Sequence, residues 1–297
     1  MLKLLTPVEC GKSRIQISYK DKIMIIGSCF ADNIGQKMAD HGFNVCVNPF
    51  GTLYNPVSIY NSIRRLEEAR EFTPEDCVPM GSGAGLICSF SHHTSFARQS
   101  MEEFLENANS GLKSASEFYR TCNRVIITFG TSWCYRHIGR DIIVSNCLKR
   151  NADEFLRERL PSGETARLLS EIISSGNISG GEHSNSGGRR FILTVSPIRH
   201  MKDGAHGNQI SKSSLLLAAD MTCSSFTGIC EYFPSYEIMM DELRDYRFYS
   251  EDMVHPSAQA VNHIWERFCE FALPEEERPV LAANEKLFRQ SQHRKMH

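Results

Sequence analysis

Residues 23–42, IMIIGSCFADNIGQKMADHG, indicate the class of the fold. The first four residues are apolar and rich in isoleucine, which predicts a short buried strand. A tight turn at Gly27-Ser28 follows, and the next residues have the apolar spacing of a helix that ends at Gly42. A buried strand, a tight turn and a helix form the opening unit of a parallel α/β sheet.

The alternation of strand and helix continues along the chain. Further buried strands are predicted at 45–47, 124–129, 190–195 and 229–233. Helices are predicted at 56–70, 101–119, 152–160, 164–174, 213–223 and 256–271, with a loop-rich segment at 71–100 and a Gly/Ser/Asn-rich loop at 176–188. This alternation predicts a doubly wound, mainly parallel sheet with helices on both faces and with loop and helical insertions.

Length and composition limit the domain organisation and the partners. The chain has 297 residues, of which 41% are apolar and 23% charged, with a net charge of −2. We therefore expect a single α/β domain over 1–273 and a charged C-terminal tail over 274–297. The balanced charge argues against nucleic acid as a partner, and no apolar run reaches the ~18–20 residues that membrane insertion needs. The sequence leaves the oligomeric state open.

The cysteines and glycines give no indication of a metal or nucleotide site. The eleven cysteines are scattered without a Cys-x-x-Cys pair, and most lie in apolar runs, as buried thiols do. Gly11-Lys12-Ser13 lacks the upstream glycine of a phosphate-binding loop, and the glycines of 81–85 follow no strand. The N-terminus does not have the pattern of a secretory signal. We expect a cytoplasmic protein without a metal or other cofactor.

Candidate catalytic residues follow the predicted strands, because ligands bind at the carboxyl ends of such strands. Ser28 lies at the first strand–helix turn. The helix N-terminus could stabilise the negative charge that develops when a nucleophile at this position reacts, although a serine there is more often a helix cap. Asp252 and His255 lie three residues apart before the last long helix. A carboxylate at this spacing can hold the imidazole so that its second nitrogen acts as a base. A surface aspartate and a histidine near a helix start are the ordinary alternative.

Polar residues after two other strands are candidate oxyanion donors. Thr131 and Ser132 follow the 124–129 strand, where backbone amides and small side chains can stabilise a developing negative charge. Gly51 is a further candidate, because glycine lets the backbone approach a ligand closely. The alternative for all three positions is simple turn chemistry.

Two further pairs of basic residues lie in predicted loops. Arg199 and His200 follow the 190–195 strand and could hold a polar or anionic part of a substrate, or be solvated loop charges. His92 and His93 form a loop pair without a carboxylate at metal-binding spacing. We therefore do not treat His92 as a ligand.

The stretch Gly27-Ser28-Cys29-Phe30-Ala31 spells the signature of the GSCFA-domain family. Further blocks that resemble this family are 48–51 with 54–56, 89–96, 129–133, 195–200 and 252–256. The resemblance runs from about Ile23 to Phe268. The family is in turn distantly similar to SGNH (GDSL-type) hydrolases, which implies a flavodoxin-like three-layer α/β/α sandwich.

The resemblance to SGNH hydrolases implies roles for individual residues. Ser28 matches the nucleophile of the first SGNH block, and Asp252 and His255 match the last block. Gly51 stands for the glycine of the second block, whereas Ser132 occupies the position where the third block usually has asparagine. The implied oxyanion hole consists of Ser28, Gly51, Thr131 and Ser132, with Asn48 as an alternative donor. The implied substrate-binding residues are Asn48, His93, Arg199 and His200.

These residues predict a serine esterase or deacylase that hydrolyses an O-acyl ester. By analogy, the substrate is a short acyl group, such as acetyl, on a carbohydrate or cell-envelope precursor. An O-acyltransferase with the same nucleophile and a non-catalytic binding protein that keeps the fold are alternatives. A further variant assigns the nucleophile to Cys29, although we expect that side chain to pack inward.

Overall fold

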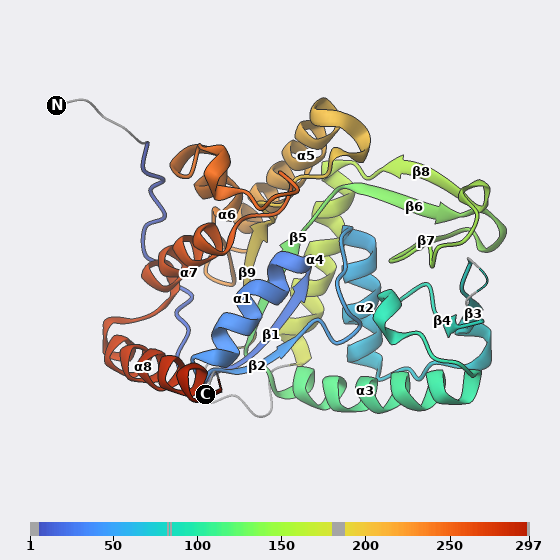
Figure 1. The fold of residues 1–297 in the computed structure, drawn as a ribbon, viewed down its shortest axis with the longest axis horizontal. Helices are drawn as coiled ribbons and strands as arrows, with labels where there is room; N and C mark the ends of the chain where they lie inside the picture. Colours follow the sequence, from blue (N-terminus) through green and yellow to red (C-terminus); the bar gives the residue numbers. More distant parts are fainter. Residues whose placement is uncertain (1–5, 82, 84, 180–187, 296–297) are drawn as a thin grey trace.

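The computed structural model describes residues 6–81, 83, 85–179 and 188–295, and a five-stranded parallel sheet forms its centre (Figure 1). The strands, in their order across the sheet, are β10 (Cys230–Tyr232), β9 (Arg190–Val195), β5 (Arg124–Phe129), β1 (Lys22–Gly27) and β2 (Asn44–Val47). All four neighbouring pairs are parallel, which confirms the predicted strands and their direction. The chain order across the sheet reverses between β1 and β5, and such a switch point opens a crevice for ligands.

Helices cover both faces of the sheet and complete a three-layer α/β arrangement. They are α1 (Cys29–Asp40), α2 (Pro56–Glu68), α3 (Met101–Thr121), α4 (Ser162–Ser179), α5 (Gly204–Ser225), the short α6 (Ser235–Glu237), α7 (Ala258–Ala272) and α8 (Arg278–Lys295). Met24 and Ile26 of β1 share a core with residues of α2 to α5, whereas Ile23 and Ile25 share a second core with α1 and α7. The side chains of β1 alternate between the two faces, so the apolar run 23–26 contributes to both cores.

The prediction of a helix over 152–160 is wrong. Residues Phe155–Arg159 form β8, which pairs antiparallel with β6 (Trp133–His137), and β6 also pairs with β7 (Ile142–Val144). This small sheet projects from the main body on the side away from α8 (Figure 1). Arg157 and Arg159 are two residues apart and bond to Asp203 and Ser214, respectively. The strand is therefore stabilised by distant partners that local helix propensity does not reflect.

The segment 274–297, predicted only as a charged tail, contains a helix. This helix, α8, packs beside α1 (Figure 1). The Asn284 amide donates a hydrogen bond of 2.7 Å to the His41 carbonyl at the end of α1, and Leu281 packs against the core between α1 and α7. Residues 296–297 at the end of this segment lie outside the described residues, as does most of the predicted loop 176–188.

The described residues contain no cluster that could bind a metal ion, because no three or more of their His, Cys, Asp or Glu side chains lie together in a suitable group. Each of the eleven cysteines carries a free thiol. Within the same ranges, no helix combines the length and the apolar character that crossing a membrane requires.

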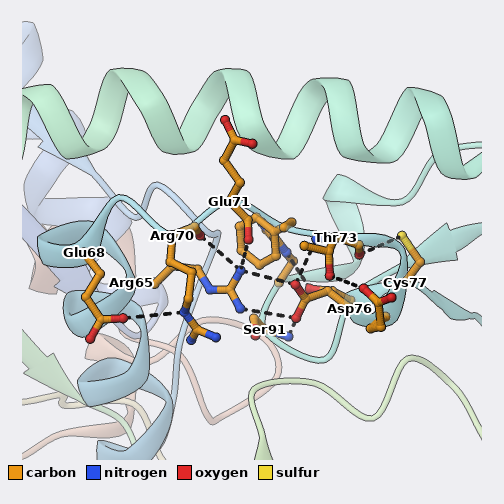
Figure 2. A network of polar contacts seen from close by, with 12 residues as sticks. Arg65, Glu68, Arg70, Glu71, Thr73, Asp76, Cys77 and Ser91 are labelled. Carbon is orange, nitrogen blue, oxygen red and sulfur yellow. Dashed lines mark hydrogen bonds and ion pairs between the residues drawn. The ribbon is translucent and has the colours of Figure 1, made fainter.

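A buried arginine anchors the segment between α2 and α3. The Arg65 guanidinium donates to the carbonyls of Arg70 and Glu71 and to the carboxylate of Asp76, at 3.2 to 3.4 Å (Figure 2). It also lies 3.8 Å from the ring centroid of Phe72. These contacts hold the start of the connection 69–100 against α2. This connection contains the predicted loop-rich segment 71–100 and includes β3 (Val78–Pro79) and β4 (Ile87–Cys88).

We expect Arg65→Met to lower the free energy of unfolding by about 2 kcal/mol or more, because three partly buried acceptors lose their buried donor. Arg64→Met is the matched control. Arg64 is the neighbouring residue on the same helix, but it is more exposed and pairs with Glu67 and Glu68, so its loss should cost about 0.5 kcal/mol or less. Urea unfolding of both variants measures the difference. Equal effects would contradict an anchoring role for Arg65.

Candidate active site

The candidate site lies at the carboxyl end of β1, at the switch point of the sheet. Ser28 directly follows β1. The Ser28 hydroxyl caps α1 by accepting a hydrogen bond of 3.3 Å from the Phe30 amide, and it lies 3.3 Å from the Thr128 hydroxyl. The Ser28 amide donates to the Thr128 carbonyl at 3.1 Å. With 1% of its surface exposed, Ser28 is directed into the fold.

Cys29 is the residue that faces the solvent side of this turn. The cap geometry of Ser28 turns its hydroxyl back toward the helix, and Cys29 occupies the first helical position. Contrary to the expectation that its side chain packs inward, Cys29 is half-buried and lines two separate cavities. Its Sγ atom lies 3.8 Å from Nε2 of His255. Among the described residues, the hydroxyl of Ser28 contacts Thr128 and Phe30 and makes no hydrogen bond to His255.

The structure brings His255 and Asp252 together in one tight turn. One carboxylate oxygen of Asp252 lies 2.6 Å from Nδ1 of His255, and the other accepts the amides of Val254 and His255 at 2.9 Å each. These two amide hydrogen bonds, together with the imidazole, lower the pKa of Asp252 to about 2. Because an ionised carboxylate accepts the Nδ1 proton, we assign the lone pair to Nε2, the nitrogen that faces the thiol.

Burial opposes ionisation of the Cys29 thiol. Desolvation raises the pKa of Cys29, and the nearby Asp32 carboxylate raises it further. The resting sulfur is therefore a neutral thiol near neutral pH. A neutral thiol becomes a strong nucleophile when an adjacent base removes its proton, and the nearest such base is His255.

A first cavity, of about 600 Å³, lies on one side of Cys29, and we call it the Asp32 cavity. The predicted residues Asn48, Gly51 and His93 all line it. Asn48 donates through its amide to the Asp32 carboxylate at 2.6 Å, and the Gly51 amide donates to the Asn48 carbonyl at 2.7 Å. A Cβ atom on Gly51 would lie 2.3 Å from the His93 Cβ, and φ of Gly51 is +79°, so glycine is required there.

A second cleft, of about 430 Å³, lies on the other side of Cys29 and contains His255. The predicted residues Thr131, Arg199 and His200 line it. Burial, together with nearby positive charge, lowers the pKa of His200 to about 3, so this ring is neutral at neutral pH. Its Nε2 atom is buried and makes no hydrogen bond within the described residues. This cleft also contains Arg157 and Lys202, and we call it the basic cleft.

The backbone donors that were predicted for an oxyanion hole are engaged within the fold. The Thr131 amide donates to the Tyr54 carbonyl at 2.9 Å, and the Ser132 amide donates to the Ser211 hydroxyl at 2.8 Å. The Ser132 hydroxyl is buried, and Ser132 lines neither cavity. The amide of Cys29, at the first position of α1, is one of the helix N-terminal donors that have no intrahelical acceptor.

A buried lysine beneath the site was not anticipated from the sequence. Lys212 of α5 donates to the carbonyls of Gly130 and Ser196 at 2.7 Å each. These residues directly follow β5 and β9, so the ammonium group joins the ends of two central strands. Burial lowers the pKa of Lys212 to about 7. A single lysine before the apolar run 215–219 was the only sequence signal for this role.

Comparison with known proteins assigns the chain to a family. The chain is a three-layer α/β protein in which a thiol, an imidazole and a carboxylate lie next to one another near the switch point of the sheet. The model of the GSCFA family matches residues 22–268, and the chain belongs to this family. The match runs from β1 into α7 and includes Cys29, Asp252 and His255. No curated protein matches the chain.

Proposed function

We propose that this protein is an acyl-ester hydrolase related to SGNH hydrolases, and that Cys29 rather than Ser28 is its nucleophile. The proposal rests on one observation. The Sγ atom of Cys29 lies 3.8 Å from Nε2 of His255, whose Nδ1 lies 2.6 Å from the Asp252 carboxylate. A nucleophile, a base and a residue that orients the base are the arrangement used in nucleophilic acyl transfer.

The reaction would proceed through an acyl-thioester. Nε2 of His255 accepts the thiol proton while Sγ of Cys29 attacks the ester carbonyl carbon. The tetrahedral intermediate then collapses, the carbon–oxygen bond of the ester breaks, and the alcohol leaves with the proton from His255. Water next attacks the thioester, again with His255 as base, and releases the carboxylic acid and the free thiol.

The N-terminus of α1 would stabilise the oxyanion of the intermediate. The amide of Cys29 belongs to the first turn of this helix, where unpaired N–H groups and the helix dipole favour negative charge. The other amides considered from sequence donate within the fold, so we assign the principal donor to Cys29 itself. For the substrate we retain the expectation of a short O-acyl ester on a carbohydrate or cell-envelope precursor.

A single-turnover acylation experiment tests this proposal. The protein is mixed with p-nitrophenyl acetate, quenched in acid, and analysed by intact mass and peptide mapping. We expect one acetyl group on Cys29 that neutral hydroxylamine removes, because thioesters are much more labile to this reagent than oxygen esters. Cys147 lines the same cleft and makes no hydrogen bond to a histidine among the described residues; it is the internal control and should remain unmodified.

Three other outcomes would contradict the proposal. A hydroxylamine-resistant acetyl group on Ser28 would restore the serine mechanism. No acetyl group on folded protein would favour a binding protein that retains the fold. A His255→Ala variant that acylates as fast as wild type would show that the imidazole does not activate the thiol.

A further inference from the structure

The basic cleft has a positively charged wall. Arg157, Arg199 and Lys202 line it together with Cys29 and His255, and no aspartate or glutamate among the described residues does so. Arg157 comes from β8 of the projecting sheet, whereas Arg199 and Lys202 come from the segment that follows β9. Two segments that are about 40 residues apart in the sequence therefore direct cationic groups to one cavity.

Two of these three charges have no carboxylate partner within the described part of the chain. Arg157 is neutralised by Asp203, which accepts from its Nε at 2.6 Å and from its second guanidinium nitrogen. Lys202 donates to the hydroxyl of Tyr135, and Arg199 makes a 3.4 Å contact with the carbonyl of Met253. Unpaired cations in a concave site are available to a ligand anion.

The wall is held in shape by aromatic rings. The guanidinium of Arg157 lies 5.3 Å from the ring centroid of Trp133 and 4.7 Å from that of Tyr135. The ammonium of Lys202 lies 4.9 Å from the Tyr135 ring centroid. These contacts position the cations before any ligand binds, and the rings add apolar surface for the body of a ligand.

The position of His255 decides which part of an ester would enter this cleft. The leaving alcohol must take its proton from Nε2 of His255, and His255 lines the basic cleft but not the Asp32 cavity. The alcohol part of the ester therefore belongs in the basic cleft. The acyl part belongs on the other side of Cys29, where the Asp32 carboxyl would disfavour an anion.

We propose that the basic cleft binds an anionic group, a carboxylate or a phosphate, on the alcohol part of the ester. The substrate is then an O-acyl ester of an anionic alcohol, which is a more specific class than a neutral acylated sugar. This inference rests on the proposed hydrolase function for the assignment of the alcohol side. It names Lys202 and Arg199 as the residues that recognise the anion.

Matched esters test the inference. 4-Acetoxybenzoate and methyl 4-acetoxybenzoate differ in one negative charge, and 4-acetoxyphenyl phosphate distinguishes phosphate from carboxylate. We expect the KM of wild type to be at least about 10-fold lower for an anionic ester than for the neutral one, and this preference to weaken as salt is added. Lys202→Gln should lose most of the preference, and Lys202→Arg should retain it. Lys12→Gln, which removes a lysine paired with Glu275, is the control and should behave as wild type.

A binding measurement separates this inference from the proposed function. Calorimetric titration of intact 4-acetoxybenzoate into Cys29→Ala does not depend on turnover. One outcome is that Cys29→Ala binds the anion, the added Lys202→Gln substitution abolishes this binding, and wild type does not hydrolyse the ester. This outcome would support the anion site and overturn the hydrolase function. Hydrolysis of the neutral and both anionic esters with equal KM would overturn the anion site and leave the hydrolase intact.

Discussion

Replacement of Cys29 by alanine is expected to lower the rate of ester hydrolysis by about 10³-fold or more, since loss of a triad nucleophile has effects of this size. The variant retains His255 and Asp252 but has no atom that can form the acyl intermediate. Initial rates with p-nitrophenyl acetate, corrected for spontaneous hydrolysis, measure the effect. The substitution at a half-buried position should leave the fold intact, which circular dichroism and thermal unfolding check.

Two further variants make the assignment to Cys29 specific. Ser28→Ala removes the cap of α1, so it should lower the free energy of unfolding by about 1 kcal/mol and still allow acylation of Cys29. Cys77→Ala removes a partly exposed thiol that contacts the Thr73 carbonyl (Figure 2), and it should leave the rate unchanged. An inactive Ser28→Ala combined with an active Cys29→Ala would reverse the assignment of the nucleophile.

Asp252→Asn should lower kcat by about 10³- to 10⁴-fold, comparable to the loss in other triads that exchange this carboxylate for an amide. The asparagine oxygen can still accept the amides of Val254 and His255, so the turn should survive. Its NH₂ group would then face Nδ1 and favour the tautomer with the proton on Nε2. That tautomer cannot accept the thiol proton of Cys29.

Asp245→Asn is a matched control for this substitution. Asp245 also caps a turn, by accepting the Arg247 amide, but its second oxygen pairs with the Arg247 side chain instead of a histidine. It lines neither the Asp32 cavity nor the basic cleft, so kcat should change little. Equal losses of kcat in the two variants would mean that the Asp252 effect is structural.

The pH dependence of stability follows from the lowered pKa of Asp252. Its pKa in the folded state is about 2, below the ordinary value of 3.8. The folded state therefore favours the ionised form, and this stabilisation is complete above the ordinary pKa and disappears as the pH falls toward the folded-state value. Wild type should be more stable than Asp252→Asn at neutral pH, and urea midpoints of the two proteins should converge between about pH 4 and pH 2. A constant difference would contradict the assigned hydrogen bonds.

The strands of the sheet were predictable because their signal is local. A run such as 23–26 is apolar at every position, and only a strand buried on both faces needs that composition. The pairing of Asp252 with His255 was also predictable, because a spacing of three residues in a tight turn leaves the two side chains few positions in which they do not meet. The strand β8 was not, since Arg157 and Arg159 depend on partners more than 40 residues away.

The strands of the sheet, the candidate site at the end of β1 and the family were all predictable from the sequence. Which of two adjacent residues faces His255 depends on the tertiary structure. Ser28 and Cys29 are neighbours in sequence. The Ser28 hydroxyl accepts a hydrogen bond from the Phe30 amide and is turned toward the helix, while Cys29 remains open to the cavities. The cationic wall likewise exists only in the fold, because β8 and the segment after β9 become adjacent through the Arg157–Asp203 pair.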